Sequence, residues 1–183
     1  MGTITEKRKY TYEDYLKTPD DKRYELIEGD LLMTPSPNAK HQEILMNLSA
    51  KIHQHVMGKN LGKVFIAPLD VHLGDNVVQP DILFISRERM NIIGEKNVQD
   101  APDLVVEILS ESTAYRDTIH KKKLYARFGV KECWLVAPED RLVEVYTLKD
   151  KGGYQLLKTY SDKDVIESQV VKGLKIELSK VFA

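Results

Sequence analysis

The feature that most constrains the fold is the apolar run Leu104–Leu109, which is interrupted by one acid, Glu107. Side chains alternate between the two faces of a β-strand, and in this run both faces are apolar apart from Glu107. Such a strand is typical of a sheet that is covered on both sides. Because an ionised carboxylate in an apolar setting is costly unless it is paired, the sequence predicts a partner for Glu107. That partner is either a buried Arg or Lys of the core or a cation bound at a functional site.

The composition indicates an ordinary globular protein. The chain has 183 residues, of which 42% are hydrophobic, and this fits one domain over residues 1–183. The net charge of −1 gives no general basic excess, although a local basic patch is compatible with it. The one cysteine, Cys133, excludes an internal disulfide and a multi-cysteine zinc site. The N-terminal stretch lacks the apolar core of a signal peptide, and no apolar run approaches the ~20 residues of a membrane span, so we expect a soluble cytoplasmic protein.

The remaining pattern alternates strands with two substantial helices. Apolar residues recur at helical spacing over 38–57, and a second helix is expected over 115–128. Residues 23–34 are predicted to form a hairpin that turns at Gly29–Asp30, and residues 63–86 to form two β runs around a turn-like Gly-Asp-Asn. Another hairpin is expected near the C-terminus. This mixture indicates an α/β or α+β fold.

A second acid, Asp81, occupies a similar place before another apolar run. It follows Pro80, which cannot donate a ladder hydrogen bond and therefore suits the start of a strand, and it precedes Ile82–Ile85. Taken alone, Pro-Asp is most simply a turn. Together with Glu107, however, two strands each present one carboxylate, and such a pair fits Mg²⁺, which prefers oxygen ligands. A bound metal would also offset the charge of Glu107.

The helix after Glu107 is rich in basic residues. Most of them fit a solvated basic face: Arg116, Lys122, Lys123 and Arg127. Lys121 differs, because the apolar Leu124, Tyr125 and Phe128 follow it three, four and seven residues later and share its face. We therefore expect Lys121 on the buried side of the helix, leaning toward the strand ends.

Two further residues, His41 and Glu25, have less specific settings. His41 shares a helix face with Ile44, so it is either a packed or capping histidine or part of a site. Glu25 alternates with the apolar Tyr24 and Leu26, so it is either a surface acid on an edge strand or an acid near a metal. The sequence alone leaves both pairs of alternatives open.

These residues lie in segments that resemble the Uma family of restriction-endonuclease-like proteins, within the PD-(D/E)xK nuclease superfamily. The resemblance covers most of the chain and rests on an ordered series of segments: YTYEDYL, RYELIEGDLL, SPNAKHQEIL, PLDVHL, VQPDILFIS, PDLVVEILSEST and KKKLYARFGVKECWLV. It implies a restriction-endonuclease-like fold, in which a central mixed β-sheet is flanked by helices, here with extra β-hairpins.

The resemblance also implies a catalytic site. Asp81 matches the Asp of the superfamily motif and Glu107 its second acid, and the pattern adds the backbone carbonyl of Ile108 as a third ligand of Mg²⁺ or Mn²⁺. The motif lysine, two residues after the acid, is replaced here by Leu109. The family uses a displaced lysine, and the matching position is Lys121, the residue that helical spacing singled out independently.

The expected function is metal-dependent hydrolysis of phosphodiester bonds in nucleic acid, with DNA as the expected substrate. Glu25 and His41 match the family's upstream Glu and His, and Arg116 is a candidate for contact with the nucleic-acid backbone. The alternative is an inactive module that keeps the nuclease fold for nucleic-acid binding or assembly, which the missing motif lysine favours. A homodimer is also compatible, because cutting both strands of a duplex needs two sites.

Overall fold

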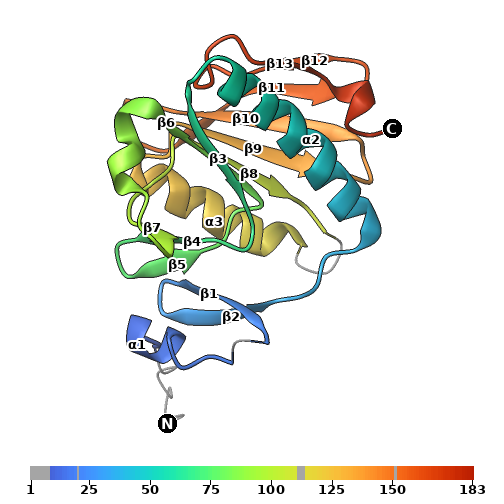
Figure 1. Ribbon diagram of the computed structural model, residues 1–183. Helices are drawn as coiled ribbons and strands as arrows, with labels where there is room; N and C mark the ends of the chain where they lie inside the picture. Colours follow the sequence, from blue (N-terminus) through green and yellow to red (C-terminus); the bar gives the residue numbers. More distant parts are fainter. Residues whose placement is uncertain (1–8, 20, 111–113, 151) are drawn as a thin grey trace.

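The computed structural model describes the backbone of residues 9–19, 21–110, 114–150 and 152–183, and the side chains of all of these except 114–118. Its centre is a six-stranded mixed sheet (Figure 1). In spatial order its strands are β11 (Tyr154–Ser161), β10 (Leu142–Leu148), β9 (Glu132–Ala137), β8 (Leu104–Ile108), β6 (Ile82–Ser86) and β3 (Gly62–Ile66). Strands β8 and β9 are parallel, and the other neighbours in this sheet are antiparallel.

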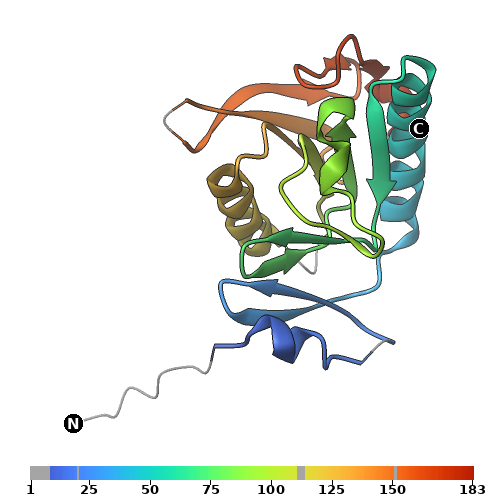
Figure 2. The same ribbon diagram turned by 60° about the vertical axis from the view of Figure 1, so that its left-hand side comes forward.

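A second sheet and the helices surround this centre. The second sheet runs β2 (Asp30–Thr34), β1 (Arg23–Ile27), β5 (Asn76–Val78), β4 (Asp70–Leu73) and β7 (Asn97–Val98). The helices are α1 (Tyr12–Tyr15), α2 (Ala39–Gly58) and α3 (Ala114–Phe128), with 3₁₀ turns η1 (Arg87–Ile92) and η2 (Leu178–Lys180). A small two-stranded sheet pairs β12 (Val165–Glu167) with β13 (Lys175–Glu177). Figure 2 shows α2 and α3 on opposite faces of the six-stranded sheet.

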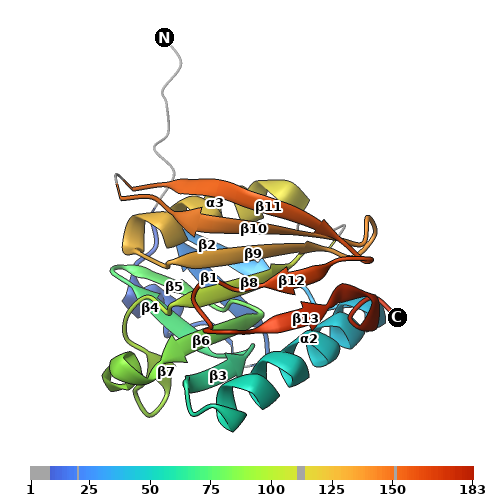
Figure 3. The same cartoon turned by 90° about the horizontal axis from the view of Figure 1, so that it is seen from above.

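Side chains of the central strands alternate between two separate cores. Phe84 and Val106 pack with α2 and with the C-terminal segment, which lies over the same face of the sheet (Figure 3). Leu83 and Val105 pack in the other core, against α3 and against strands of the second sheet. The sheet is therefore covered on both faces, as the two-faced apolar run predicted. Glu107 follows the alternation that points toward α3.

The two long helices confirm the predicted ranges to within one residue. Helix α2 begins after Asn38, whose side chain accepts a hydrogen bond from the backbone N–H of His41 and so caps the helix. Helix α3 ends at Phe128, and the following Gly129 has a positive φ of +88°, which suits a residue that stops a helix. The capping role that His41 was a candidate for thus belongs to Asn38.

Two predicted strand boundaries were wrong. The N-terminal hairpin turns at Glu28 and Gly29, which both have positive φ, so the turn comes one residue earlier than expected. The segment 63–86 forms four strands instead of two, because each apolar run is interrupted by a proline, Pro68 or Pro80, where no ladder hydrogen bond can be donated. Strands β3 and β6 join the central sheet, whereas β4 and β5 join the second one.

The observed architecture confirms the predicted fold class, a mixed β-sheet flanked by helices with added hairpins. Within the described residues, no helix combines the length and the apolar character needed to cross a membrane. The assignment of residues 1–183 to a single domain stays a prediction.

Candidate active site

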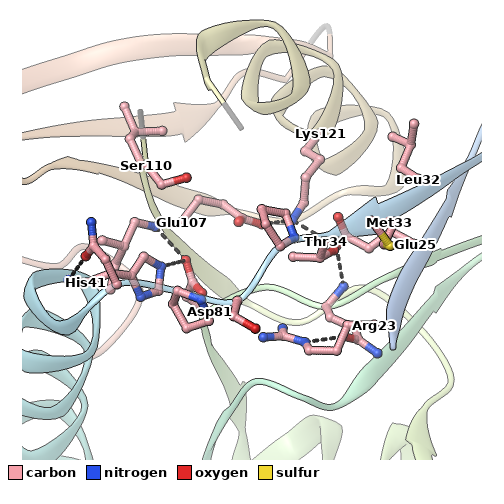
Figure 4. Close-up of a pocket in the computed structure, with 17 residues that line it drawn as sticks. Arg23, Glu25, Leu32, Met33, Thr34, His41, Asp81, Glu107, Ser110 and Lys121 are labelled. Carbon is pink, nitrogen blue, oxygen red and sulfur yellow. Dashed lines mark hydrogen bonds and ion pairs between the residues drawn. The ribbon is translucent and has the colours of Figure 1, made fainter. Parts of the chain in front are cut away.

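Strand pairing brings the two predicted acids to the same edge of the central sheet. In the antiparallel register of β6 and β8, Ile82 pairs with Val106. Asp81, just before β6, and Glu107, near the end of β8, therefore lie opposite one another, one position beyond this pair, and face the same side. The Oδ2 atom of Asp81 accepts a hydrogen bond of 2.7 Å from the backbone N–H of Ile108. The carboxylate of Asp81 is therefore fixed against the end of β8, beside Glu107 (Figure 4).

Lys121 reaches these acids from helix α3, as its helical face predicted. Its ammonium nitrogen lies 2.7 Å from Oε1 of Glu107 and 2.9 Å from Oε1 of Glu25. All three side chains are buried, with relative exposures of 7–8%. Figure 4 shows Lys121 entering between the two acids. Glu25 is thus a buried acid of this cluster on an interior strand, and not a surface acid on an edge strand.

Tyr125 also contacts Glu107, a contact that the sequence did not reveal. Its hydroxyl donates a hydrogen bond of 2.5 Å to Oε1 of Glu107. Tyr125 is fully buried and lies one helical turn after Lys121. Its position on the face of Lys121 predicts only packing. A polar atom on an otherwise apolar helix face, four residues from the lysine, was the signal available.

The charges of this cluster set its protonation states. Burial raises the pKa of Glu107 to about 7, and the charges of Asp81 and Glu25 add to this effect, while the Lys121 ammonium opposes it. Burial alone would lower the pKa of Lys121, but the charges of Glu107 and Glu25 outweigh burial and raise it. Lys121 is therefore a fixed positive charge at neutral pH. Burial and the charge of Glu107 raise the pKa of Tyr125, so it remains a donor.

His41 lies on the other side of Asp81, in the first turn of α2. Its Nε2 atom is 3.3 Å from Oδ2 of Asp81. Its Nδ1 atom is buried and has no hydrogen-bond partner among the described residues. The contact with Asp81 means that Nε2 carries a proton, because the carboxylate can only accept. His41 therefore contacts Asp81 and lines the same pocket.

These side chains line a pocket of about 260 Å³. One wall is formed by β2 and by the segment 35–38, which crosses from β2 to α2. The residues that face the pocket include the following: Arg23, Glu25, Thr34, His41, Gln79, Asp81, Glu107, Ile108, Ser110 and Lys121. The closest contacts of the acids are made through one oxygen each: Oε1 of Glu25, Oε1 of Glu107 and Oδ2 of Asp81.

The donor set fits a hard divalent cation in one particular mode. The described residues contain no group of three or more His, Cys, Asp or Glu side chains arranged to hold a metal ion. Asp81 and Glu107 offer carboxylate oxygens, and the carbonyl of Ile108 would offer a third oxygen. Mg²⁺ commonly binds through one or two carboxylates and keeps several waters, whereas a closed protein cage is unusual for it. The site therefore suits an open Mg²⁺ or Mn²⁺ site and not a cage.

Arg116, the candidate for backbone contact, lies outside the described side chains.

Comparisons with known proteins agree with this architecture. The crystal structure of "a putative nuclease belonging to DUF820 from Anabaena variabilis" superposes with a TM-score of 0.77, covering 94% of this chain and 97% of that chain at 23% identity. At 23% identity, this structural similarity shows that the two chains share a fold. No curated protein sequence matches the chain. The pattern of the Uma2 family, described as "Putative restriction endonuclease", matches residues 12–179. The chain therefore belongs to the Uma2 family, as its ordered segments predicted.

Proposed function

We propose that the protein is a divalent-metal-dependent nuclease that hydrolyses phosphodiester bonds of nucleic acid, with DNA as the expected substrate. The observation that carries this proposal is the meeting of Asp81, Glu107 and Lys121, from two strands and a helix, in one pocket. Membership of the Uma2 family supports it. A purely structural ion pair needs neither a second acid at the same edge of the sheet nor an open pocket.

In this proposal, Asp81, Glu107 and the carbonyl of Ile108 hold Mg²⁺ or Mn²⁺. A divalent ion bound there would polarise the scissile phosphate and lower the pKa of a bound water. The hydrogen bond from the backbone N–H of Ile108 holds the carboxylate of Asp81 in place for this purpose. His41 orients the same carboxylate through its Nε2 atom.

Lys121 stabilises negative charge on the phosphate and does not act as the general base. Its raised pKa keeps it protonated at neutral pH, so it has no lone pair with which to take a proton from water. A fixed positive charge in a buried site is effective against charge that develops during the reaction. Glu25 holds the ammonium on its other side and serves as a positioning residue.

A cleavage assay tests the proposal. The wild type is incubated with supercoiled plasmid, single-stranded DNA and RNA in Mg²⁺, in Mn²⁺ and in EDTA. The variant Glu107→Gln is compared with Glu167→Gln, a matched change at an exposed acid of β12 that pairs with Lys175. We expect metal-dependent cleavage by the wild type and by Glu167→Gln, and loss of cleavage in Glu107→Gln. Cleavage that persists unchanged in Glu107→Gln would rule out this assignment.

The second candidate function is an inactive nuclease-fold module for nucleic-acid binding or assembly. It is favoured by Leu109 at the position of the motif lysine, and by the contacts that Lys121 and Tyr125 both make with Oε1 of Glu107. Calorimetric titration with Mn²⁺ separates the two functions. Binding that depends on Asp81 and Glu107 supports the nuclease, whereas an inactive module needs no such binding.

A homodimer and a cytoplasmic location remain parts of the proposal.

A further inference from the structure

Arg23 presents a positive charge to the pocket that no acid in the described part of the chain neutralises. It is half-buried at the start of β1, and in Figure 4 it lies on the side of the pocket opposite Lys121. Its Nε–H donates a hydrogen bond of 3.1 Å to Oε1 of Gln79. Within the described residues, no carboxylate oxygen comes within the 4.0 Å of an ion pair with its guanidinium. In a pocket that already holds three acids, this arrangement leaves a guanidinium available to a ligand.

Gln79 fixes the direction in which Arg23 points. Its Nε2 donates a hydrogen bond of 2.8 Å to Oδ1 of Asp70, and the hydroxyl of Tyr15 donates to the same oxygen at 2.8 Å. A carboxylate can only accept, so the amide of Gln79 must turn its NH₂ group to Asp70 and its carbonyl oxygen to Arg23. The order of the amide atoms is thus determined by Asp70, and the Nε atom of Arg23 is held by a defined acceptor.

Gln79 also connects Arg23 to the acids of the pocket. The backbone N–H of Gln79 donates a hydrogen bond of 2.7 Å to Oε1 of Glu25, and this oxygen also contacts Lys121. Gln79 can make both contacts because it directly follows β5, which pairs with β1 through Leu26 and Val77. Arg23 and Lys121 are therefore placed relative to one another by a continuous set of hydrogen bonds.

A guanidinium held only at Nε keeps its two terminal nitrogens, with four N–H groups, for a ligand. Two parallel N–H groups match the oxygens of a phosphate, which is why arginine is favoured for phosphate recognition. We propose that Arg23 binds a backbone phosphate of the nucleic-acid strand in the pocket, and that Gln79 is its positioning residue. This inference rests on the proposed function, because it takes the ligand of the pocket to be nucleic acid.

The test is binding of a 5′-fluorescein-labelled single-stranded oligothymidylate, followed by fluorescence anisotropy at several salt concentrations. Ca²⁺ replaces Mg²⁺ as the probe metal, and a gel confirms that the strand stays intact. The variants are Arg23→Ala, Arg23→Lys and Gln79→Ala. The matched control is Lys22→Ala, which removes the same charge from the neighbouring exposed residue outside the pocket. Thermal unfolding checks that each variant is folded.

We expect Arg23→Ala to weaken binding about tenfold or more, because a charged hydrogen-bonded contact is lost. The slope of log affinity against log salt should fall by about 0.7, as for one lost phosphate contact on a single strand. Gln79→Ala should weaken binding about threefold with the slope unchanged, since the charge remains while its direction is lost. In the Arg23→Ala background, Gln79→Ala should cost nothing further. Arg23→Lys should keep the slope and bind less tightly than the wild type.

Equal binding by Arg23→Ala and Lys22→Ala would overturn the inference, as would a wild type that does not bind the strand. The fate of the proposed function is read separately. Arg23-dependent binding by a wild type that never cuts nucleic acid would leave the inference standing and remove the nuclease. Normal cutting together with binding that does not depend on Arg23 would support the nuclease and overturn the inference about Arg23.

Discussion

The ammonium nitrogen of Lys121 lies 2.7 Å from Oε1 of Glu107, at the end of a strand that is buried along its whole length. This contact unites the two alternatives that the sequence left open for Glu107. It is an ion pair within the protein, and it also borders a pocket that contains a second strand-end acid, Asp81. The consequences of the pair for stability and for metal binding are therefore separable by experiment.

Replacing Lys121 by Met should destabilise the fold strongly. The change leaves Glu107 and Glu25 buried next to one another without a cation, and breaking one side of a buried pair costs about 3–5 kcal/mol. The loss should be largest near pH 8 and smaller near pH 5.5, because burial makes Glu107 take up a proton more readily in the folded state than in the unfolded one, and this proton removes its unpaired charge. Urea unfolding at the two pH values measures this.

The control for this variant is Lys123→Met, on the exposed face of the same helix. It should change the free energy of unfolding by less than about 0.5 kcal/mol at either pH. Equal losses in the two variants would mean that Lys121 is not the partner that makes a buried Glu107 tolerable.

Removing the hydroxyl of Tyr125 should reduce both stability and cleavage. In Tyr125→Phe, the free energy of unfolding should fall by about 1–2 kcal/mol, and cleavage by about tenfold, since Glu107 loses the donor that fixes its carboxylate. Tyr154→Phe is the matched control. It deletes a partly buried hydroxyl that donates to the carbonyl of Val130, and it should lose stability while cleavage is retained. A similar effect of both changes on cleavage would argue against a positioning role for Tyr125.

Metal affinity should rise with pH around neutrality. Burial raises the pKa of Glu107 to about 7. A metal ligand must be deprotonated, so below pH 7 each unit should weaken Mn²⁺ binding by up to about tenfold, and above pH 8 the affinity should level off. Calorimetry at pH 6, 7 and 8, in buffers of different ionisation enthalpy, should show proton release that declines from pH 6 to pH 8. An affinity independent of pH would exclude Glu107 as the titrating ligand.

Much of the fold followed from local pattern, and the exceptions have a common cause. Helices α2 and α3 are predictable because their apolar faces are set by residues three and four positions apart. Asn38, which caps the start of α2, and Gly129, which follows the end of α3, are local signals as well. In the segment 63–86, Pro68 and Pro80 mark where the strands divide, but no local feature determines which sheet each strand joins. The pairing of Ile66 with Ile82 places β3 and β6 together and leaves the residues between them to another sheet.

The candidate site shows the same difference between contacts set by nearby residues and contacts that depend on the fold. Lys121 was placed correctly because its side of the helix is set by residues three and four positions away. The contact between Gln79 and Arg23 was not foreseen, since it depends on the pairing of β1 with β5 and on Asp70, which are brought together only by the fold. Tyr125 was counted as packing because a tyrosine in a core looks the same in sequence whether or not its hydroxyl is used.

The central claim is that Asp81 and Glu107 share one divalent ion, and a crystal soaked in Mn²⁺ tests it most directly. The account predicts an anomalous density peak contacted by the carboxylates of Asp81 and Glu107 and by the carbonyl of Ile108, and its absence from crystals of Glu107→Gln. A wild-type crystal in which no peak appears between these two acids, or in which manganese binds elsewhere while Lys121 still covers Glu107, would contradict it.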